Sequence, residues 1–319
     1  MQLIKSYKLS KFIILLIFII MVLNPAVTLI GARHGLLLWF NVIIPSLLPS
    51  MIISNIIVSV YGETFKSPFS YIVFTGLLCG YPLGAATTVQ LSNKNKMDTQ
   101  KMQFLMAICN NSSPMFITNY IIISTLNQQE NLFQIIAIIY VPLLLLIMLF
   151  MICNHTSPRR MIKANSHKTN IIELNPKKAD IIKSNLKKTD IRNLNIHAID
   201  SSIMTGFEII TKVGGYIILF SILSAYIQSL PIKNELLKCI ITGTLEITTG
   251  IDSIGKAGFS MELKKLLVCT VTAFGGMSCI AQTHSIINKS GFSIKKYIYH
   301  KIIITLLTAF MAYLMIYVL

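Results

Sequence analysis

Gly80-Tyr81-Pro82-Leu83-Gly84 interrupts a long apolar run between residues 68 and 90, and this interruption decides how the chain must fold. Pro82 has no backbone N–H and disfavours a helical Tyr81, while the glycines allow backbone angles and close approaches that other residues forbid. Inside a lipid bilayer, irregular backbone is stable only where it is buried in protein or lines a wet cavity. The stretch therefore predicts a broken membrane helix beside a site.

Three other apolar runs are interrupted in the same way, at Asn110-Asn111-Ser112-Ser113-Pro114, Thr248-Thr249-Gly250 and Gly275-Gly276-Met277-Ser278. A broken helix has unpaired N–H groups and a partial positive charge at its new N-terminus, which suit a carboxylate or a phosphate. For any single break the alternative is a kink whose amides are satisfied by neighbouring helices. Four breaks favour a substrate or ion site. The candidate substrate-binding residues are Gly80, Tyr81, Pro82, Gly84, Asn110, Asn111, Ser112, Ser113, Thr248, Thr249, Gly250, Gly275, Gly276, Ser278 and Gln282.

The composition is that of a membrane protein, because 54% of the residues are hydrophobic and only 13% are charged, whereas soluble domains carry roughly 25% charged residues. We expect an all-α polytopic fold without a separate soluble domain, since about 20 apolar residues span a bilayer as a helix. The nine apolar segments are 12–30, 36–60, 68–90, 102–126, 132–153, 203–229, 236–256, 264–288 and 296–319. The first follows a lysine cluster as a signal peptide would, but its length and its Asn24-Pro25 favour an uncleaved helix.

The formal net charge of +16 does not indicate a nucleic-acid partner, because the basic residues cluster in loops. Residues 154–202 form the longest basic loop, which the positive-inside rule places in the cytoplasm. A ten-residue repeat in this loop includes Lys177-Lys178-Ala179-Asp180-Ile181 and Lys187-Lys188-Thr189-Asp190-Ile191. We interpret it as a solvated linker rather than a contact with anionic lipid headgroups.

Two halves of the chain show the same spacing of apolar runs. A shift of 167 residues moves 36–60 onto 203–227, and the next three runs also meet runs of the second half. The expected parts are an N-terminal transmembrane helix (1–34), a first repeat (35–153), the basic cytoplasmic loop (154–202) and a second repeat (203–319). Charge predicts inverted repeats, with the lysines of 289–301 on the cytoplasmic side. Each half then crosses an odd number of times, and the segments broken at 110–114 and 275–278 are the expected re-entrant ones.

Glu246 lies near the middle of its apolar segment, so it is the candidate group for coupling to a proton or a cation. The alternative is a carboxylate that is hydrogen-bonded within the bundle. The six cysteines contain no Cys-x-x-Cys pair, and we expect buried apolar roles rather than a metal site. The chain lacks the motifs of metalloproteases, serine hydrolases and phosphate loops, so neither an enzyme nor a cofactor is expected.

Four motifs follow one another in the chain: Gly80-Tyr81-Pro82-Leu83-Gly84-Ala85, Cys109-Asn110-Asn111-Ser112-Ser113-Pro114, Leu245-Glu246-Ile247-Thr248-Thr249-Gly250-Ile251 and Phe274-Gly275-Gly276-Met277-Ser278. Together they resemble the sporulation integral membrane proteins of endospore-forming Firmicutes, part of the nucleoside-recognition or Gate-domain group. The resemblance runs from about Trp39 to the last helix. It implies a role in spore formation and, for this branch, passage of dipicolinic acid across the outer forespore membrane. Relatives carry Lys after the Gly-Ala of the first motif, where this chain has Ala86.

Dipicolinate is a small planar dianion, which helix N-termini and Asn or Ser donors can bind. We therefore expect a secondary transporter or facilitator for a small anionic metabolite, with other sporulation membrane proteins as further partners in the bilayer. One alternative is a nucleoside or metal-ion permease, since other Gate-domain proteins handle those cargoes. Another is a membrane assembly factor for the spore envelope that transports nothing.

Overall fold

The computed structural model describes residues 15–61, 68–95, 98–127, 131–155, 196–288 and 290–318, which form helices and short connections without a strand. Within these described residues, five helices are long and apolar enough to cross a membrane, namely Pro25–Ile53, Leu132–Ile152, Ile199–Ser229, Met261–Ile287 and Ile294–Val318. The all-α class is confirmed, whereas the count of nine membrane segments stays a prediction. The ten-residue repeat of the basic loop lies outside the described residues.

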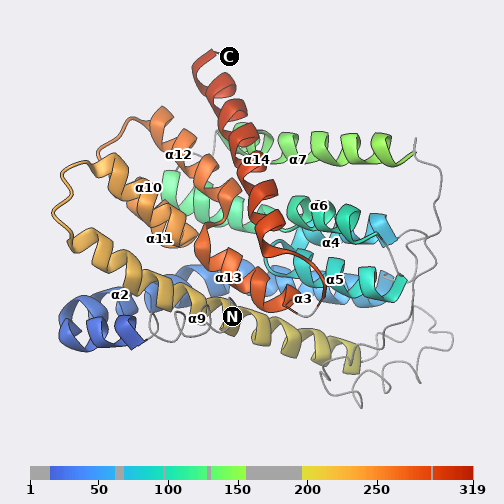
Figure 1. Ribbon diagram of the computed structural model, residues 1–319, viewed down its shortest axis with the longest axis horizontal. Helices are drawn as coiled ribbons and strands as arrows, with labels where there is room; N and C mark the ends of the chain where they lie inside the picture. The colour runs from blue at the N-terminus through green and yellow to red at the C-terminus, as the bar shows by residue number, and fades with distance from the viewer. Residues whose placement is uncertain are drawn as a thin grey trace, which may run out of the picture.

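Both halves of the chain have the same order of helices (Figure 1). The first half consists of α2 (Pro25–Leu38), the π-helical η1 (Trp39–Ile43), α3 (Ile44–Tyr61), α4 (Pro68–Cys79), α5 (Leu83–Asn95), α6 (Thr99–Cys109), the π-helical η3 (Phe116–Leu126) and α7 (Leu132–His155). The second half consists of α9 (Ile196–Ser229), α10 (Glu235–Leu245), α11 (Ile247–Lys256), α12 (Met261–Phe274), α13 (Gly276–Ile287), α14 (Ile294–Tyr313) and the π-helical η5 (Leu314–Val318). Each half is thus a long helix, two broken pairs and a closing long helix.

The first apolar run is helical at 15–23, is interrupted at Asn24, and continues as a helix further than the sequence indicated. Pro25 starts α2 because proline is tolerated in the first helical turn, and Asn24 before it is not helical. From there α2, η1 and α3 run without interruption to Tyr61, so the helix does not end near residue 34. Gly31 and Gly35 let α9 come close to this stretch: a Cβ on Gly31 would lie 2.6 Å from the Ile222 Cα.

The two long helices that open the halves run antiparallel to each other (Figure 1). Near one end Gly31 faces Ile222, and near the other Leu48 faces Gly206. Midway between them the Trp39 indole Nε1 donates a 2.9 Å hydrogen bond to the Ile210 carbonyl. Equivalent helices of the two halves therefore have opposite chain directions.

The two broken pairs in each half differ in shape. α10 and α11 fold back on each other as a hairpin, since Gly243 and Gly250 meet so closely that a Cβ on Gly250 would lie 2.1 Å from the Gly243 Cα. α4 and α5 also pack along one another. In contrast, α12 and α13 do not pack along one another, and neither do α6 and η3. The hairpins are thus 68–95 and 235–256, and the prediction of re-entrant segments at 110–114 and 275–278 is wrong in this respect.

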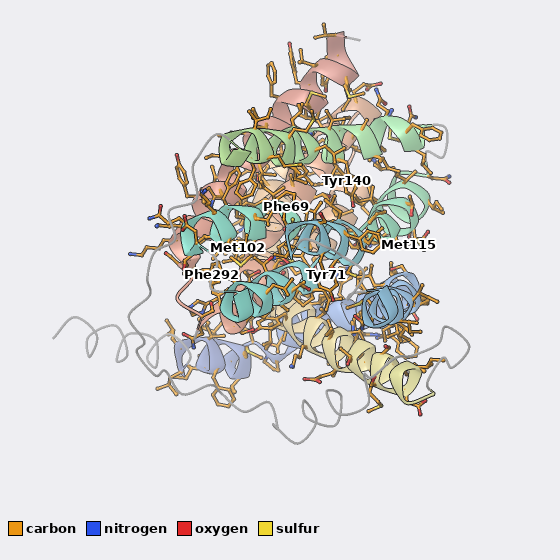
Figure 2. The ribbon with its side chains drawn as sticks, turned by 90° about the vertical axis from the view of Figure 1, so that its right-hand side faces the viewer. Phe69, Tyr71, Met102, Met115, Tyr140 and Phe292 are labelled. Atoms are coloured by element: carbon orange, nitrogen blue, oxygen red, sulfur yellow. The ribbon has the colours of Figure 1, made fainter. Side chains whose placement is uncertain are left out.

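Contacts between the halves come in matched pairs. α5 packs on α13 as α11 packs on η3, and α6 packs on α14 as α12 packs on α7. Side chains fill the space between these layers, as Figure 2 shows around Met102 on α6 and Tyr140 on α7. The Tyr140 hydroxyl donates to the carbonyls of Leu77 and Ser112, at 3.2 and 3.1 Å. These reciprocal contacts hold the four breaks in the interior.

Candidate functional site

Residues from all four breaks line one central cavity. Tyr81 comes from the first break, Ser112 and Ser113 from the second, Glu246 and Thr248 from the third, and Ser278 and Gln282 from the fourth. Apolar side chains of the two opening helices, among them Ile43 and Ile217, complete the lining. Polar groups that are far apart in the sequence thus converge between apolar walls, as in small-molecule sites.

The remaining predicted site residues do not line this cavity, and most of them pack behind its wall. Close packing explains why two of these positions are occupied by glycine. A Cβ on Gly84 would lie 2.3 Å from the Cys109 carbonyl oxygen, and one on Gly275 would lie 2.2 Å from the Tyr81 hydroxyl. The other residues behind the wall are Gly80, Pro82, Asn110, Asn111, Gly250 and Gly276, and Thr249 lies on a second cavity. The breaks therefore lie at the cavity as predicted, but fewer than half of the candidate residues reach it.

The first two breaks satisfy much of each other's freed backbone. Tyr81, which precedes Pro82 in a cis peptide bond, donates its backbone N–H to the Asn111 carbonyl at 2.9 Å. The Asn110 side chain accepts from the Ala85 N–H at 3.3 Å. It also donates to the Thr283 and Tyr297 hydroxyls, at 3.0 and 2.9 Å. Asn110 therefore joins the halves and has no free group for a ligand.

A buried lysine lies directly behind these breaks. Lys301 on α14 is fully buried, its amine donates a 2.6 Å hydrogen bond to the Asn111 side-chain oxygen, and it lies 5.2 Å from the centre of the Tyr81 ring. In the described part of the chain no carboxylate forms an ion pair with it. We expected Lys301 in a cytoplasmic loop, and that prediction is wrong. The apolar residues Ile302-Ile303-Ile304 directly after it were the signal for a helix.

The third break lies at Glu246 rather than at Thr248 to Gly250, which form the first turn of α11. Glu246 is extended and serves as the N-cap, because its Oε2 atom accepts from the Thr249 N–H at 2.6 Å, from the Thr249 hydroxyl at 2.9 Å and from the Thr248 hydroxyl. A carboxylate at this position also interacts favourably with the helix dipole. Its Oε1 atom is buried and has no hydrogen-bond partner among the described residues. One carboxyl oxygen of Glu246 is thus fully hydrogen-bonded, and the other has no hydrogen bond to any residue that the structure describes.

The fourth break lies at Gly275, whose positive φ of 84° ends α12 in the left-handed region. Gly276 follows with a φ of 76° and packs against Glu246 and Ile247. The Ser278 hydroxyl, one turn further on and 1% exposed, is buried without a partner among the described residues. Glu246 and Ser278 therefore bring two unsatisfied oxygen atoms to the lining of one cavity.

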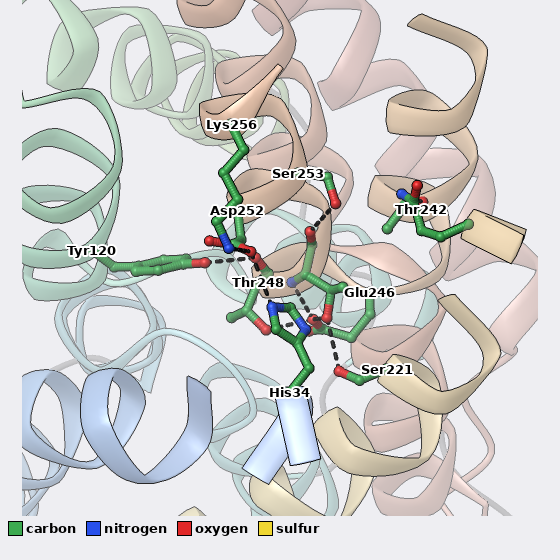
Figure 3. A network of polar contacts seen from close by, with 11 residues as sticks. His34, Tyr120, Ser221, Thr242, Glu246, Thr248, Asp252, Ser253 and Lys256 are labelled. Carbon is green, nitrogen blue, oxygen red and sulfur yellow. Dashed lines mark hydrogen bonds and ion pairs between the residues drawn. The ribbon is translucent and has the colours of Figure 1, made fainter. Parts of the chain in front are cut away.

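A second cavity lies on the other side of the start of α11. Its lining includes His34, Ser221, Thr249, Asp252 and Lys256. Figure 3 shows His34, Asp252 and Lys256 close together: the His34 ring lies 3.0 Å from the Asp252 carboxylate, and Lys256 bonds the same oxygen at 2.7 Å. Two adjacent threonines thus divide the cavities, with Thr248 on the central one and Thr249 on the second.

The central cavity is small as it stands. Its volume is about 50 Å³, which holds a few water molecules at about 10–15 Å³ each. A metabolite with a ring and two carboxylates needs more room than this. The cavity must therefore widen before such a ligand fits.

Comparison with known proteins agrees with the resemblance noted in the sequence. The chain is 23% identical over 312 residues to the sporulation integral membrane protein YlbJ of Bacillus subtilis (strain 168), and the match covers 86% of this chain and 74% of that protein. No family model matches the chain, and no solved structure matches it. The similarity to the sporulation integral membrane proteins is thereby confirmed, and with the five long apolar helices it identifies a multi-pass membrane protein.

Proposed function

We propose that this chain is a secondary transporter or facilitator that moves a small anionic metabolite, dipicolinic acid, across the outer forespore membrane during sporulation. The observation that carries the proposal is the meeting of four broken segments at one cavity, with the buried Lys301 amine behind its wall. Broken helices around a central site are the arrangement that secondary transporters use. The similarity to a sporulation membrane protein supports a role in a membrane during sporulation.

Lys301 supports an anionic cargo. A buried ammonium group is costly without a counter-charge, and Asn111 supplies only a neutral acceptor. An anion in the cavity would lie on the far side of Tyr81 and Ser112, within reach of this charge across a medium of low polarity. A protonated Lys301 would give the site the positive charge that the first motif, with Ala86, does not supply.

The antiparallel opening helices support inverted repeats. If α2 to α3 and α9 both cross the membrane, their opposite directions make the two halves inverted copies. A hairpin at 68–95 or 235–256 enters and leaves the membrane on the same side. Each half then crosses the membrane three times: by its opening helix, by the pair that does not fold back (α6 with η3, or α12 with α13) and by its closing helix. The end of α5 with Lys94 and the start of α6 with Lys101 then lie on the cytoplasmic side, in agreement with the positive-inside rule. Inverted halves that rock about a shared site give alternating access.

A nucleoside or cation permease is the second candidate, favoured by Glu246 and Ser278. The unsatisfied oxygen of the Glu246 carboxylate suits the hydroxyl donors of a sugar or a bound cation better than it suits an anion, and the Ser278 hydroxyl can donate to or accept from a sugar. An assembly factor without transport is the third candidate, and the small cavity volume is compatible with it.

Uptake into liposomes that contain the purified protein separates the three candidates. Labelled dipicolinate, uridine and ferrous iron are offered in parallel, and protein-free liposomes give the background. We expect saturable uptake of dipicolinate alone. Uptake of uridine or iron instead would establish the second candidate, and uptake of none of the three would leave the assembly factor.

A further inference from the structure

Glu246 poses an electrostatic problem for an anion site. Its carboxyl group is fully buried, lines the central cavity and has one oxygen without a partner. An ionised carboxylate there would repel an incoming dianion strongly, because water does not screen charges in a buried site. The anion and the negative charge of Glu246 therefore exclude each other.

A chain of hydroxyl groups leads from this carboxyl group to the second cavity. The Thr249 hydroxyl donates to the Glu246 Oε2 atom at 2.9 Å, and the Ser221 hydroxyl lies 2.8 Å from the Thr249 hydroxyl. Ser221 and Thr249 both line the second cavity, which His34, Asp252 and Lys256 border (Figure 3). Lys256 is largely exposed. The chain therefore connects a buried acid with a cavity that reaches the surface.

We propose that Glu246 is the coupling group of the transporter, and that it receives a proton from the second cavity through Ser221 and Thr249 before the anion enters the central cavity. A hydronium ion in the second cavity gives a proton to Ser221, which passes its own proton to Thr249, and Thr249 passes its proton to Glu246. Rotation of the two hydroxyls restores the chain. The cargo then moves together with one proton. This inference rests on the proposed transport function and adds its driving ion.

Several other polar and titratable groups lie around Glu246. Tyr81 and Cys279 line the same cavity, and the Tyr120 hydroxyl donates to the Thr248 carbonyl at 2.6 Å. Asp252 lies further along α11 and is paired with His34 and Lys256. None of these groups bonds the free oxygen of Glu246. Glu246 is therefore the acid whose protonation changes the charge of the central cavity.

Carbodiimide labelling tests the protonation of Glu246 without any transport. A hydrophobic carbodiimide reacts with protonated carboxyl groups in apolar sites, and mass spectrometry of the peptide that contains Glu246 reports the adduct. We expect labelling that increases as pH falls and that disappears in Glu246→Gln. Labelling that is absent from the wild type would overturn the inference.

A transport measurement tests the coupling and the route. In liposomes with an acidic exterior, the wild type should accumulate dipicolinate above its equilibrium level, whereas Glu246→Gln should equilibrate dipicolinate without responding to the pH gradient. Thr249→Val should slow the gradient-driven accumulation by about tenfold or more, whereas Thr249→Ser, which keeps the hydroxyl, should not. Thr211→Val, at an exposed position of α9, is the matched control, because its hydroxyl bonds only its own helix.

Gradient-driven accumulation by Glu246→Gln, or accumulation at the wild-type rate by Thr249→Val, would contradict the inference and leave the proposed function intact. Dipicolinate transport absent from every variant would instead refute the proposed function, while the labelling result still decides whether Glu246 takes up a proton.

Discussion

The Lys301 amine donates a 2.6 Å hydrogen bond to the Asn111 side chain, which connects the closing helix of the second half to the second break of the first half. This bond joins residues 190 positions apart. It places a fully buried amine one layer behind the central cavity, beside the Tyr81 ring. The anion specificity that we propose depends on this amine.

Replacing Lys301 with glutamine should reduce dipicolinate uptake and leave the fold intact. Glutamine keeps a donor for Asn111 but removes the charge, so we expect a loss of about 10-fold to 100-fold, equivalent to about 1.5–3 kcal/mol for a bond to a charged group. Initial rates of uptake in liposomes measure the effect. Lys295→Gln, on an exposed position of the same helix, is the control. Equal uptake by the two variants would show that Lys301 is structural only.

Replacing Asn110 with alanine should destabilise the protein itself. Asn110 makes three buried hydrogen bonds, two of them to α13 and α14 across the boundary between the halves. Loss of its side chain leaves these partners unsatisfied, and we expect the free energy of unfolding to fall by about 3 kcal/mol. Titration with SDS, followed by circular dichroism, gives this value. The exposed Asn288→Ala substitution should change it little, and equal stability of both variants would refute the structural role.

Replacing Gly250 with alanine should disrupt the hairpin of α10 and α11. The added Cβ would lie 2.1 Å from the Gly243 Cα, so the two backbones must separate, at a cost of about 1–3 kcal/mol. Gly215→Ala is a matched control in α9, where an added Cβ meets no atom within 4 Å. Thermal unfolding in detergent should give a lower midpoint for Gly250→Ala and an unchanged or higher midpoint for Gly215→Ala. The same midpoint for both would show that the hairpin is not tightly packed.

The two halves should present equivalent positions to opposite sides of the membrane. Thr99 begins α6, and Gly258 precedes the equivalent helix α12. In a cysteine-free background, Thr99→Cys should react with an impermeant maleimide only from the cytoplasmic side, and Gly258→Cys only from the outside. Labelling of both from one side would contradict the inverted arrangement.

Sequence patterns predicted the interruptions well because glycine, proline and asparagine mark irregular backbone whatever surrounds them. Three breaks lie where they were expected, while the third lies at Glu246 because the side chain of this residue caps α11. The shape of each broken pair could not be predicted, since it depends on contacts such as that between Gly243 and Gly250. The burial of Lys301 could not be predicted from charge counts either, because its partner Asn111 lies in the other half.

Equilibrium binding of labelled dipicolinate to the purified protein shows whether the four breaks form a binding site for this anion. Our account predicts one saturable site per chain, displaced by unlabelled dipicolinate but not by uridine. Binding should weaken on substitution of cavity residues from either half, Ser113→Ala in the first and Gln282→Leu in the second. The account would be contradicted if dipicolinate did not bind, or if it bound equally well to both variants.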